Sequence, residues 1–430
     1  RSLIKSPSVT TVPDEVTSIS PISHLDSKAP GITQKAIQEI STSNDGYFRF
    51  NPVIVMLIGY LEQVSPGGLD SAVRSARDKN PDFMSKLAIK DAHSFLTFAN
   101  DLLKWVPRES FEGKDIYDIL CTFYLVLDQP PLRKLQTLIR PDSQGLTWLS
   151  SWIVVYAQLV GQFLDTPASI TPSSLQSFAT SPPYRFHEAE IPKGGFRTFN
   201  SFFTRRLKPG LRPIASPDDD SVIVYPADCT YDNSLANQSV AKITPYGSVE
   251  IKNVRWPISM LLQGSAHAAD FDGGIWMHAF LNTTNYHRQH APVSGRVLEA
   301  KNIQGMAHLE ADTVGDGQVR MMGGADASEN PGYQFLQTRG LVVIENPVLG
   351  KVAFLPIGMA MVSSVDLFVA EGDVVRKGDE VSCFRFGGSD VICIFQEKAG
   401  LRVEDFIPTA GGFSKYGSIL ARAPMGGSRM

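Results

Sequence analysis

The chain has 430 residues, of which 43% are hydrophobic and 20% charged, and its formal net charge is −4. This length exceeds one ordinary hydrophobic core and predicts two or three domains. The slightly negative charge argues against a nucleic-acid-binding role, because no bulk basic field would attract phosphates. The four cysteines form no Cys-x-x-Cys pair and have no zinc-ligand spacing, which predicts a reduced, cytoplasmic setting rather than a disulfide scaffold.

The N-terminal half begins with a polar segment and continues with helical patterns. Residues 1–45 are rich in Ser, Thr and Pro and show little periodicity, which predicts a flexible arm. Its first residues lack the apolar run of a secretory signal peptide. Residues 46–190 carry apolar side chains at helical spacing, as in PVIVMLIGYLEQV, HSFLTFANDLLKWV and DIYDILCTFYLVL. We therefore expect an α-helical domain that ends in a linker.

The longest uncharged stretch runs from Ser143 to Leu164. Its length would span a bilayer, but it is interrupted by the polar residues Ser150, Ser151, Gln158 and Gln162. A buried helix is the simpler interpretation, so we predict no transmembrane segment. A weak association with a membrane surface stays open.

From residue 191 to the C-terminus the pattern changes to short β-like runs. These include SVIVYPA, GGIWMHAFL, KVAFLPIGM and DVICIFQ, separated by Gly, Pro, Asn and Asp. Runs of this length and spacing are typical of a sandwich or barrel-like domain. The predicted fold class is therefore α+β, with an N-terminal α-helical domain (46–190) followed by a β-rich domain (191–430).

Three short segments of the β-rich region carry residues that can do chemistry. Gly388 and Ser389 lie in FRFGGSDVICIFQ, which taken alone indicates an ordinary turn. His287 and His290 lie three residues apart, but no third ligand has a convincing spacing, so we predict no metal site. Asp228 ends the predicted strand SVIVYPAD, where a turn carboxylate is the usual interpretation.

Together these segments resemble the phosphatidylserine decarboxylase family, whose members carry a pyruvoyl group made from one of their own serines. The resemblance covers about residues 195–396 and includes FNSFFTRRLKPGLRPI, PAD, YHRQHAPVSG and EGDVVRKGDEVSCFRFGGS in the order of the family. The sequence is most similar to the soluble fungal branch, in which a helical domain precedes the decarboxylase domain. That branch includes the tryptophan decarboxylase of the psilocybin pathway.

The resemblance implies self-cleavage between Gly388 and Ser389, with a pyruvoyl group formed from Ser389 as the cofactor. The serine hydroxyl would attack the preceding carbonyl, and a glycine there lets the backbone bend. By family analogy His290 is the general base, Asp228 orients its ring, and His287 positions the substrate or protonates the carbanion. The pyruvoyl group would form a Schiff base with a substrate amine and withdraw electrons as carbon dioxide leaves.

The implied reaction is the decarboxylation of an amino acid, an aromatic one among the candidates, and family members are often homodimers. Trp276, Phe280 and Tyr286 are candidates for lining the substrate pocket, although core packing is the commoner role of such rings. Two alternatives stay open. One is phosphatidylserine as the substrate. The other is a repurposed family member in secondary metabolism, which keeps Ser389 uncleaved and uses the old pocket for a different reaction or for ligand binding.

The sequence departs from membrane-type family members at three positions. Cys229 stands where Gly is usual, Asn285 replaces an Asp before Tyr-His-Arg, and Asp390 replaces a Thr after the serine. A carboxylate at Asp390 could repel the charge that develops during the attack, so we expect slower processing. These differences leave the processing residues in place but weaken the case for phosphatidylserine as the substrate.

Overall fold

The structure is a computed structural model that describes residues 50–230, 240–313, 319–322, 332–361, 364–386, 389–407 and 412–424. The predicted arm (1–45) and Gly388 lie outside these residues. Most described helices precede the strands: α2 (Pro52–Val64), α3 (Gly68–Lys79), α4 (Pro81–Lys86), α5 (Ala92–Leu102), α6 (Asp115–Leu127), α7 (Pro130–Arg133), α8 (Trp148–Leu164), α9 (Pro172–Ala179) and α10 (Phe199–Phe203), with α12 (Ile258–Leu261) among the strands.

Most of the uncharged stretch forms α8, which is largely buried as its pattern predicts, although Val155 is exposed. The helix begins where the Thr147 side chain accepts a hydrogen bond from the Ser150 backbone N–H. It packs against α2, and the Trp152 indole donates to the Val53 carbonyl at 2.8 Å. Within the described part of the chain, no helix is both long and apolar enough to cross a bilayer.

The strands of the main sheet are β2 (Cys229–Thr230), β3 (Val240–Lys242), β6 (Ile275–Leu281), β8 (Gly295–Ile303), β11 (Arg339–Asn346), β12 (Gly350–Gly358), β14 (Val374–Val375), β16 (Ser389–Phe395) and β17 (Phe413–Ser414). Over the described residues their order is β14-β8-β11-β12-β16-β6-β2-β17, with β3 also paired to β6. All of these pairings are antiparallel. The predicted α+β class is thus confirmed.

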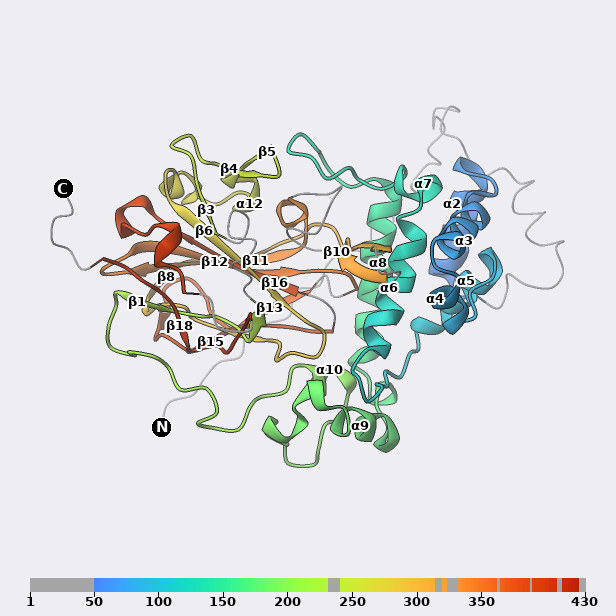
Figure 1. The fold of residues 1–430 in the computed structure, drawn as a ribbon, viewed down its shortest axis with the longest axis horizontal. Helices are drawn as coiled ribbons and strands as arrows, with labels where there is room; N and C mark the ends of the chain where they lie inside the picture. Colours follow the sequence, from blue (N-terminus) through green and yellow to red (C-terminus); the bar gives the residue numbers. More distant parts are fainter. Residues whose placement is uncertain are drawn as a thin grey trace, which may run out of the picture. The chain divides into compact units, whose positions relative to one another are not determined.

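Smaller sheets surround the main one. β7 (Arg288–His290), β13 (Val365–Leu367) and β15 (Glu380–Phe384) pair in the order β13-β15-β7. The two-stranded pairs are β1 (Val222–Val224) with β18 (Ile419–Arg422), β4 (Ser248–Ile251) with β5 (Val254–Pro257), and β9 (Glu310–Thr313) with β10 (Val319–Met322). Figure 1 shows β16 in the middle of the strands and α6 beside α8.

The central strand β16 separates two hydrophobic cores, because successive side chains of a strand point to opposite faces. The first core contains Val391, Cys393 and Phe395 together with Ala279 and Leu281. The second core contains Ile392 and Ile394 together with Trp276 and Phe335. Both faces of β16 are therefore buried, which explains its nearly continuous apolar sequence.

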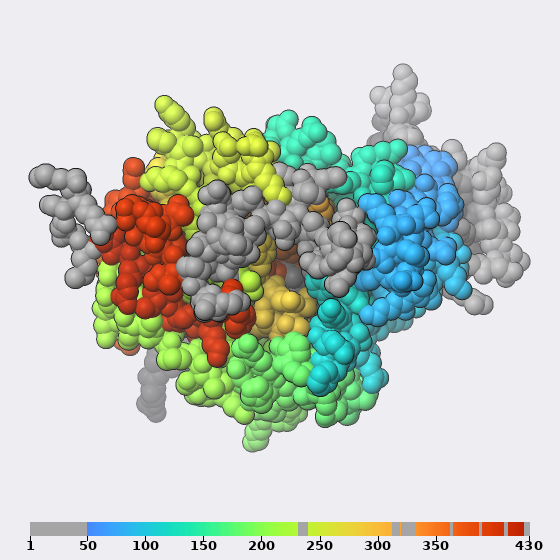
Figure 2. Space-filling view, viewed as in Figure 1, coloured from blue at the N-terminus to red at the C-terminus, as the bar shows by residue number. Residues whose placement is uncertain are grey.

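Helix α6 and the residue that follows it form hydrogen bonds with the β-rich region. The Tyr124 hydroxyl donates to the Ala307 carbonyl at 2.8 Å, and the Asp128 carboxylate accepts from the Ala311 backbone N–H at 2.9 Å. On the face shown in Figure 2, the helical region (blue to cyan) and the C-terminal strands (red) flank residues from the middle of the chain (yellow).

Candidate active site

Ser389 is the first residue of β16, where it pairs with Leu281 of β6 and Gly358 of β12. Its position in the alternation directs the side chain to the face of the first core. The residue is 2% exposed, and its hydroxyl makes no hydrogen bond to any described residue. A buried hydroxyl without a partner is unfavourable for stability and calls for an explanation such as a chemical role.

His290 is held by hydrogen bonds at both ring nitrogens. Its Nδ1 lies 2.7 Å from the Gly378 carbonyl, and its Nε2 lies 3.1 Å from the Tyr286 hydroxyl. Burial lowers the pKa of His290 to about 4, although the Gly378 carbonyl opposes this shift. The ring is therefore neutral at pH 7. Because a carbonyl can only accept, Nδ1 carries the proton and Nε2 is the basic nitrogen, which accepts from Tyr286.

Asp228 makes no hydrogen bond to this ring, whose two nitrogens are occupied by Gly378 and Tyr286, so its orienting role stays an expectation from the family resemblance. Among the described residues, its carboxylate accepts from Arg212, at 2.9 Å from Nε and 2.5 Å from Nη2, and from the Tyr416 backbone N–H at 3.0 Å. A guanidinium fork matches a carboxylate better than an imidazole does. The two segments still meet, because the His290 N–H donates to the Pro226 carbonyl at 2.7 Å. The Tyr416 ring also stacks on His290 at 3.7 Å.

His287 has different surroundings from His290. It is fully buried and stacks on Phe203 of α10, with the ring centres 4.0 Å apart. Neither ring nitrogen makes a hydrogen bond of ordinary geometry within the described part of the chain. Burial and the nearby Arg205 cation lower the pKa of His287 to about 3, against a small opposing effect of the Asn285 backbone. His287 is therefore also neutral at pH 7.

The pairing of β15 with β7 connects the histidines to the segment that leads to Ser389. His290 pairs with Glu380, and the Phe384 N–H donates to the His287 carbonyl at 2.9 Å. After β15 the Phe386 ring packs 5.5 Å from Phe203, the ring on which His287 stacks. The chain then enters β16 at Ser389.

The predicted substrate-contacting rings divide into two groups. Tyr286 lies in the histidine segment and binds His290. Trp276 belongs to the second core, and Phe280 packs edge-on against His278 at 4.5 Å. These two rings lie on the sheet face opposite the Ser389 side chain. Their placement does not support contact with a substrate bound at Ser389.

The sequence did not point to a polar cluster around Asp390. Its carboxylate accepts hydrogen bonds from His278 Nε2 at 3.0 Å and from the Tyr333 hydroxyl at 2.6 Å. The cluster lies on the face of the second core, so this carboxylate is directed away from the Ser389 hydroxyl. The available signal was a histidine inside the otherwise apolar run IWMHAFL.

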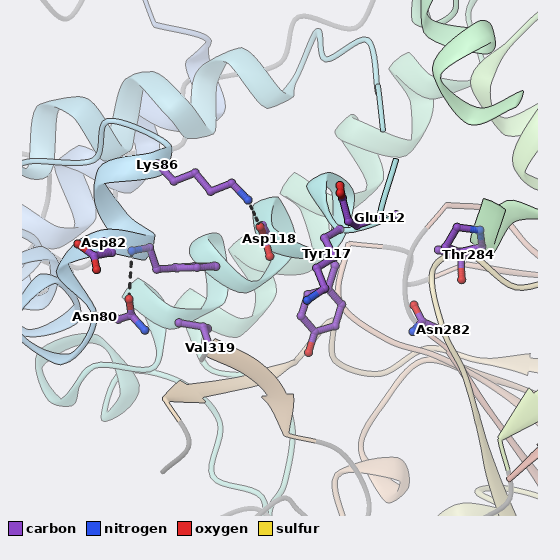
Figure 3. Close-up of a pocket in the computed structure, with 13 residues that line it drawn as sticks. Asn80, Asp82, Lys86, Glu112, Tyr117, Asp118, Asn282, Thr284 and Val319 are labelled. Carbon is purple, nitrogen blue, oxygen red and sulfur yellow. Dashed lines mark hydrogen bonds and ion pairs between the residues drawn. The ribbon is translucent and has the colours of Figure 1, made fainter. Parts of the chain in front are cut away.

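A cavity of 710 Å³ borders the loop that joins β6 to the histidine segment. Asn282 and Thr284 of this loop lie across the cavity from the ion pair between Lys86 and Asp118 (Figure 3). Asn282 directly follows Leu281, the residue paired with Ser389. The cavity thus borders the residue that follows the strand paired with Ser389, and its volume suits a small molecule.

The phosphatidylserine decarboxylase family matches residues 199–419, more than half of the chain. Decarboxylase iboD of Amanita muscaria is 30% identical over 264 residues, which are 58% of this chain and 74% of that protein. L-tryptophan decarboxylase of Psilocybe cyanescens is 27% identical over 246 residues, 54% of this chain and 52% of that protein.

Phosphatidylserine decarboxylase proenzyme 3 of Schizosaccharomyces pombe is 33% identical over 247 residues, 57% of this chain and 24% of that protein. The match covers 31% of phosphatidylserine decarboxylase proenzyme 2 of Oryza sativa. The chain thus spans about a quarter to a third of these two relatives. On the strength of the family match and the similarity to iboD, the chain belongs to the phosphatidylserine decarboxylase family.

Proposed function

We propose that this chain is a pyruvoyl-dependent decarboxylase that cleaves itself between Gly388 and Ser389 and acts on a free amino acid. One observation carries the proposal: the buried Ser389 hydroxyl has no partner among the described residues at the start of the central strand. The family match and the relatives named as decarboxylases support the reaction class.

Self-processing requires only the chain and water. The Ser389 hydroxyl attacks the Gly388 carbonyl carbon, the peptide C–N bond breaks, and the Ser389 nitrogen becomes an amine while an ester forms. A base then removes the Ser389 Cα proton, the Cβ–O bond breaks, and residues 1–388 leave with a carboxylate on Gly388. Hydrolysis of the remaining dehydroalanine releases ammonia and gives the pyruvoyl group. We assign His290 Nε2 the first proton transfer, which requires Tyr286 to release this nitrogen.

The surroundings of residue 389 fit a pyruvoyl group. Conversion of the Ser389 side chain breaks no side-chain hydrogen bond to a described residue. The strand around residue 389 is paired on both sides, with Leu281 and with Gly358. The group supplies an electrophilic carbonyl that takes up a substrate amine and accepts the electrons released with carbon dioxide. We assign His287 the relay of a proton to the substrate carbon: its neutral ring can take up a proton released by the substrate ammonium at one nitrogen while it gives the N–H proton at the other, and it has no structural hydrogen bond to a described residue to break.

The cavity beside Asn282 supports a free amino acid as the substrate. Its lining carries both signs of charge: Lys86 is paired with Asp118, and Lys114 and Glu112 also line the cavity. Such a lining suits a zwitterion better than acyl chains. Phosphatidylserine is the second candidate, favoured by the names of several relatives. A cytoplasmic location and a homodimer remain predictions.

Intact-mass analysis and carbon dioxide release test the proposal on the full chain. The wild type should give two fragments split before residue 389, the smaller with a blocked N-terminus, and should release carbon dioxide from one or more of the twenty amino acids. Phosphatidylserine vesicles test the second candidate. Ser389→Ala should fold, remain one chain and release none, since one hydroxyl contributes little to stability.

Ser382→Ala is the matched control, because Ser382 is also a buried serine and its hydroxyl bonds Gln289 at 2.8 Å. It should be cleaved like the wild type. An intact wild-type chain, or full activity in Ser389→Ala, would contradict the pyruvoyl mechanism and favour the repurposed pocket.

A further inference from the structure

The polar cluster on the other face of β16 has no role in the chemistry proposed above. Asp390 is 1% exposed and His278 is 3% exposed, yet both carry groups that favour water. The Asp390 Oδ2 atom accepts from His278 and from Tyr333, at 3.0 Å and 2.6 Å. Burial of such a cluster costs free energy unless its hydrogen bonds are good, so its place beside Ser389 calls for a reason.

The two donors come from separate and firmly packed segments. His278 lies on β6 between the rings of Trp276 and Phe280, at 5.9 Å and 4.5 Å. Tyr333 begins a short helical turn whose Phe335 packs against the Trp276 ring at 6.0 Å. The Asp390 side chain is therefore tied to two elements that do not depend on the covalent continuity of β16.

Self-cleavage creates a need for this arrangement. Once the bond before Ser389 breaks, residue 389 becomes a free strand end, and strand ends open more readily than strand centres. Residue 389 is then joined covalently to the chain only on its C-terminal side, although it stays between Leu281 and Gly358 in the sheet. A group that must meet substrate in one geometry loses rate when its position fluctuates. Asp390 is the next residue along the chain.

We propose that Asp390, bound by His278 and Tyr333, is an anchor that keeps the newly formed N-terminus of β16 in register after self-cleavage. The inference rests on the proposed function. The three residues are positioning residues, directed away from the substrate side of the strand. A carboxylate suits this task because it accepts from two donors at once and forms stronger hydrogen bonds than a neutral hydroxyl.

The test compares the anchor before and after cleavage by hydrogen–deuterium exchange of the first amides of β16. Tyr333→Phe and His278→Leu each remove one donor, and each is made in the self-cleaving chain and in Ser389→Ala. In the cleaved chain the amides of residues 390 and 391 should exchange about tenfold faster, the effect of losing one buried hydrogen bond. In the uncleaved Ser389→Ala background they should change by less than about twofold, because the upstream chain still holds the strand.

Three comparisons separate anchoring from general packing. His278→Gln keeps a donor and should restore most of the protection lost in His278→Leu. Ile392→Val removes a methylene from the same face of the same strand and should leave residues 390 and 391 protected in both backgrounds. Phenylhydrazine labels the carbonyl of the pyruvoyl group, and the added mass should be present in every cleaved variant. Faster exchange in a labelled variant then cannot be explained by a failure to form this group.

Equal acceleration in both backgrounds would make the cluster an ordinary part of the core and overturn the anchor. Unchanged exchange in the cleaved Tyr333→Phe and His278→Leu chains would overturn it as well, while leaving the proposed function intact. A wild-type chain that stays in one piece would instead overturn the proposed function, and this inference with it.

Discussion

The basic nitrogen of His290 is occupied by the Tyr286 hydroxyl, 3.1 Å away, and this contact must open before the histidine can take the Ser389 proton. Tyr286→Phe removes the competing donor and keeps the ring that stacks near His290 and Tyr416. We therefore expect this variant to cleave at least as fast as the wild type. His290→Ala should accumulate the full-length chain. Gel densitometry during expression and refolding measures the extent of cleavage of both variants. A folded Tyr286→Phe chain that stays intact would show that Tyr286 itself relays the proton.

Arg212 and Arg206 form ion pairs with very different burial, although they lie in the same segment. The side chains of Arg212 and Asp228 are 2% and 3% exposed, whereas that of Arg206, paired with Glu380, is 62% exposed. Arg212→Met leaves a buried carboxylate without its cation and should lower the free energy of unfolding by about 3–5 kcal/mol. Arg206→Met should lower it by at most about 1 kcal/mol.

Urea denaturation of the Ser389→Ala chain, which excludes effects of cleavage, measures both values. Similar losses for the two variants would mean that water reaches the Arg212–Asp228 pair. Arg212 lies in the family segment recognised in the sequence, but no feature of that segment indicates which carboxylate it binds.

At the level of elements, the two histidines lie at β7 and just before it, but they pack against different rings. His287 stacks on Phe203, and His290 stacks on Tyr416. His287→Phe conserves the stacking and removes only the nitrogens. If His287 transfers a proton to the substrate carbon, this variant should cleave normally but lose about two to four orders of magnitude in kcat. His287→Ala, which also leaves a cavity, should lower thermal stability as well.

Cleavage by intact mass, the melting temperature and the rate of carbon dioxide release are read for both variants. Normal turnover in His287→Phe would reduce His287 to a packing role. Loss of cleavage in a folded His287→Phe chain would move it into self-processing, beside His290.

The sequence patterns predicted where the helices and strands lie better than they predicted which side chains contact one another. The run DVICIFQ after Ser389 indicated a strand, and the helical periodicity before residue 164 predicted α2, α5, α6 and α8. The partner of Asp228 could not be predicted, because the sequence does not show whether an imidazole or a guanidinium will lie beside this carboxylate once the chain has folded. The Asp390 cluster depends on strand register across β6 and β16, and a shift of one residue would turn His278 to the other face.

At the scale of the whole molecule, three histidines of the described residues are buried with a lowered pKa, which couples stability to pH. Burial lowers the pKa of His287 to about 3 and those of His290 and His308 to about 4, with the Arg133 cation also acting on His308. In the unfolded chain each has an ordinary pKa near 6.5. Between pH 7 and pH 5 the unfolded chain therefore binds protons that the folded chain excludes. Stability should be fully present above about pH 6.5 and should fall as the pH drops toward 4.

The size of this effect can be isolated at His308, which lies outside the proposed active site and whose ring nitrogens have no hydrogen bond to the described residues. The linkage relation gives a loss of about 2 kcal/mol for each such histidine between pH 7 and pH 5. His308→Leu removes one titrating group and keeps a buried apolar side chain, so the fall in unfolding free energy should be smaller by about that amount. Urea denaturation at the two pH values, again in Ser389→Ala, gives the difference. All other titrating groups are shared by the two proteins, so their contributions cancel in this difference. An equal fall in unfolding free energy for both proteins would show that His308 can take up its proton without unfolding.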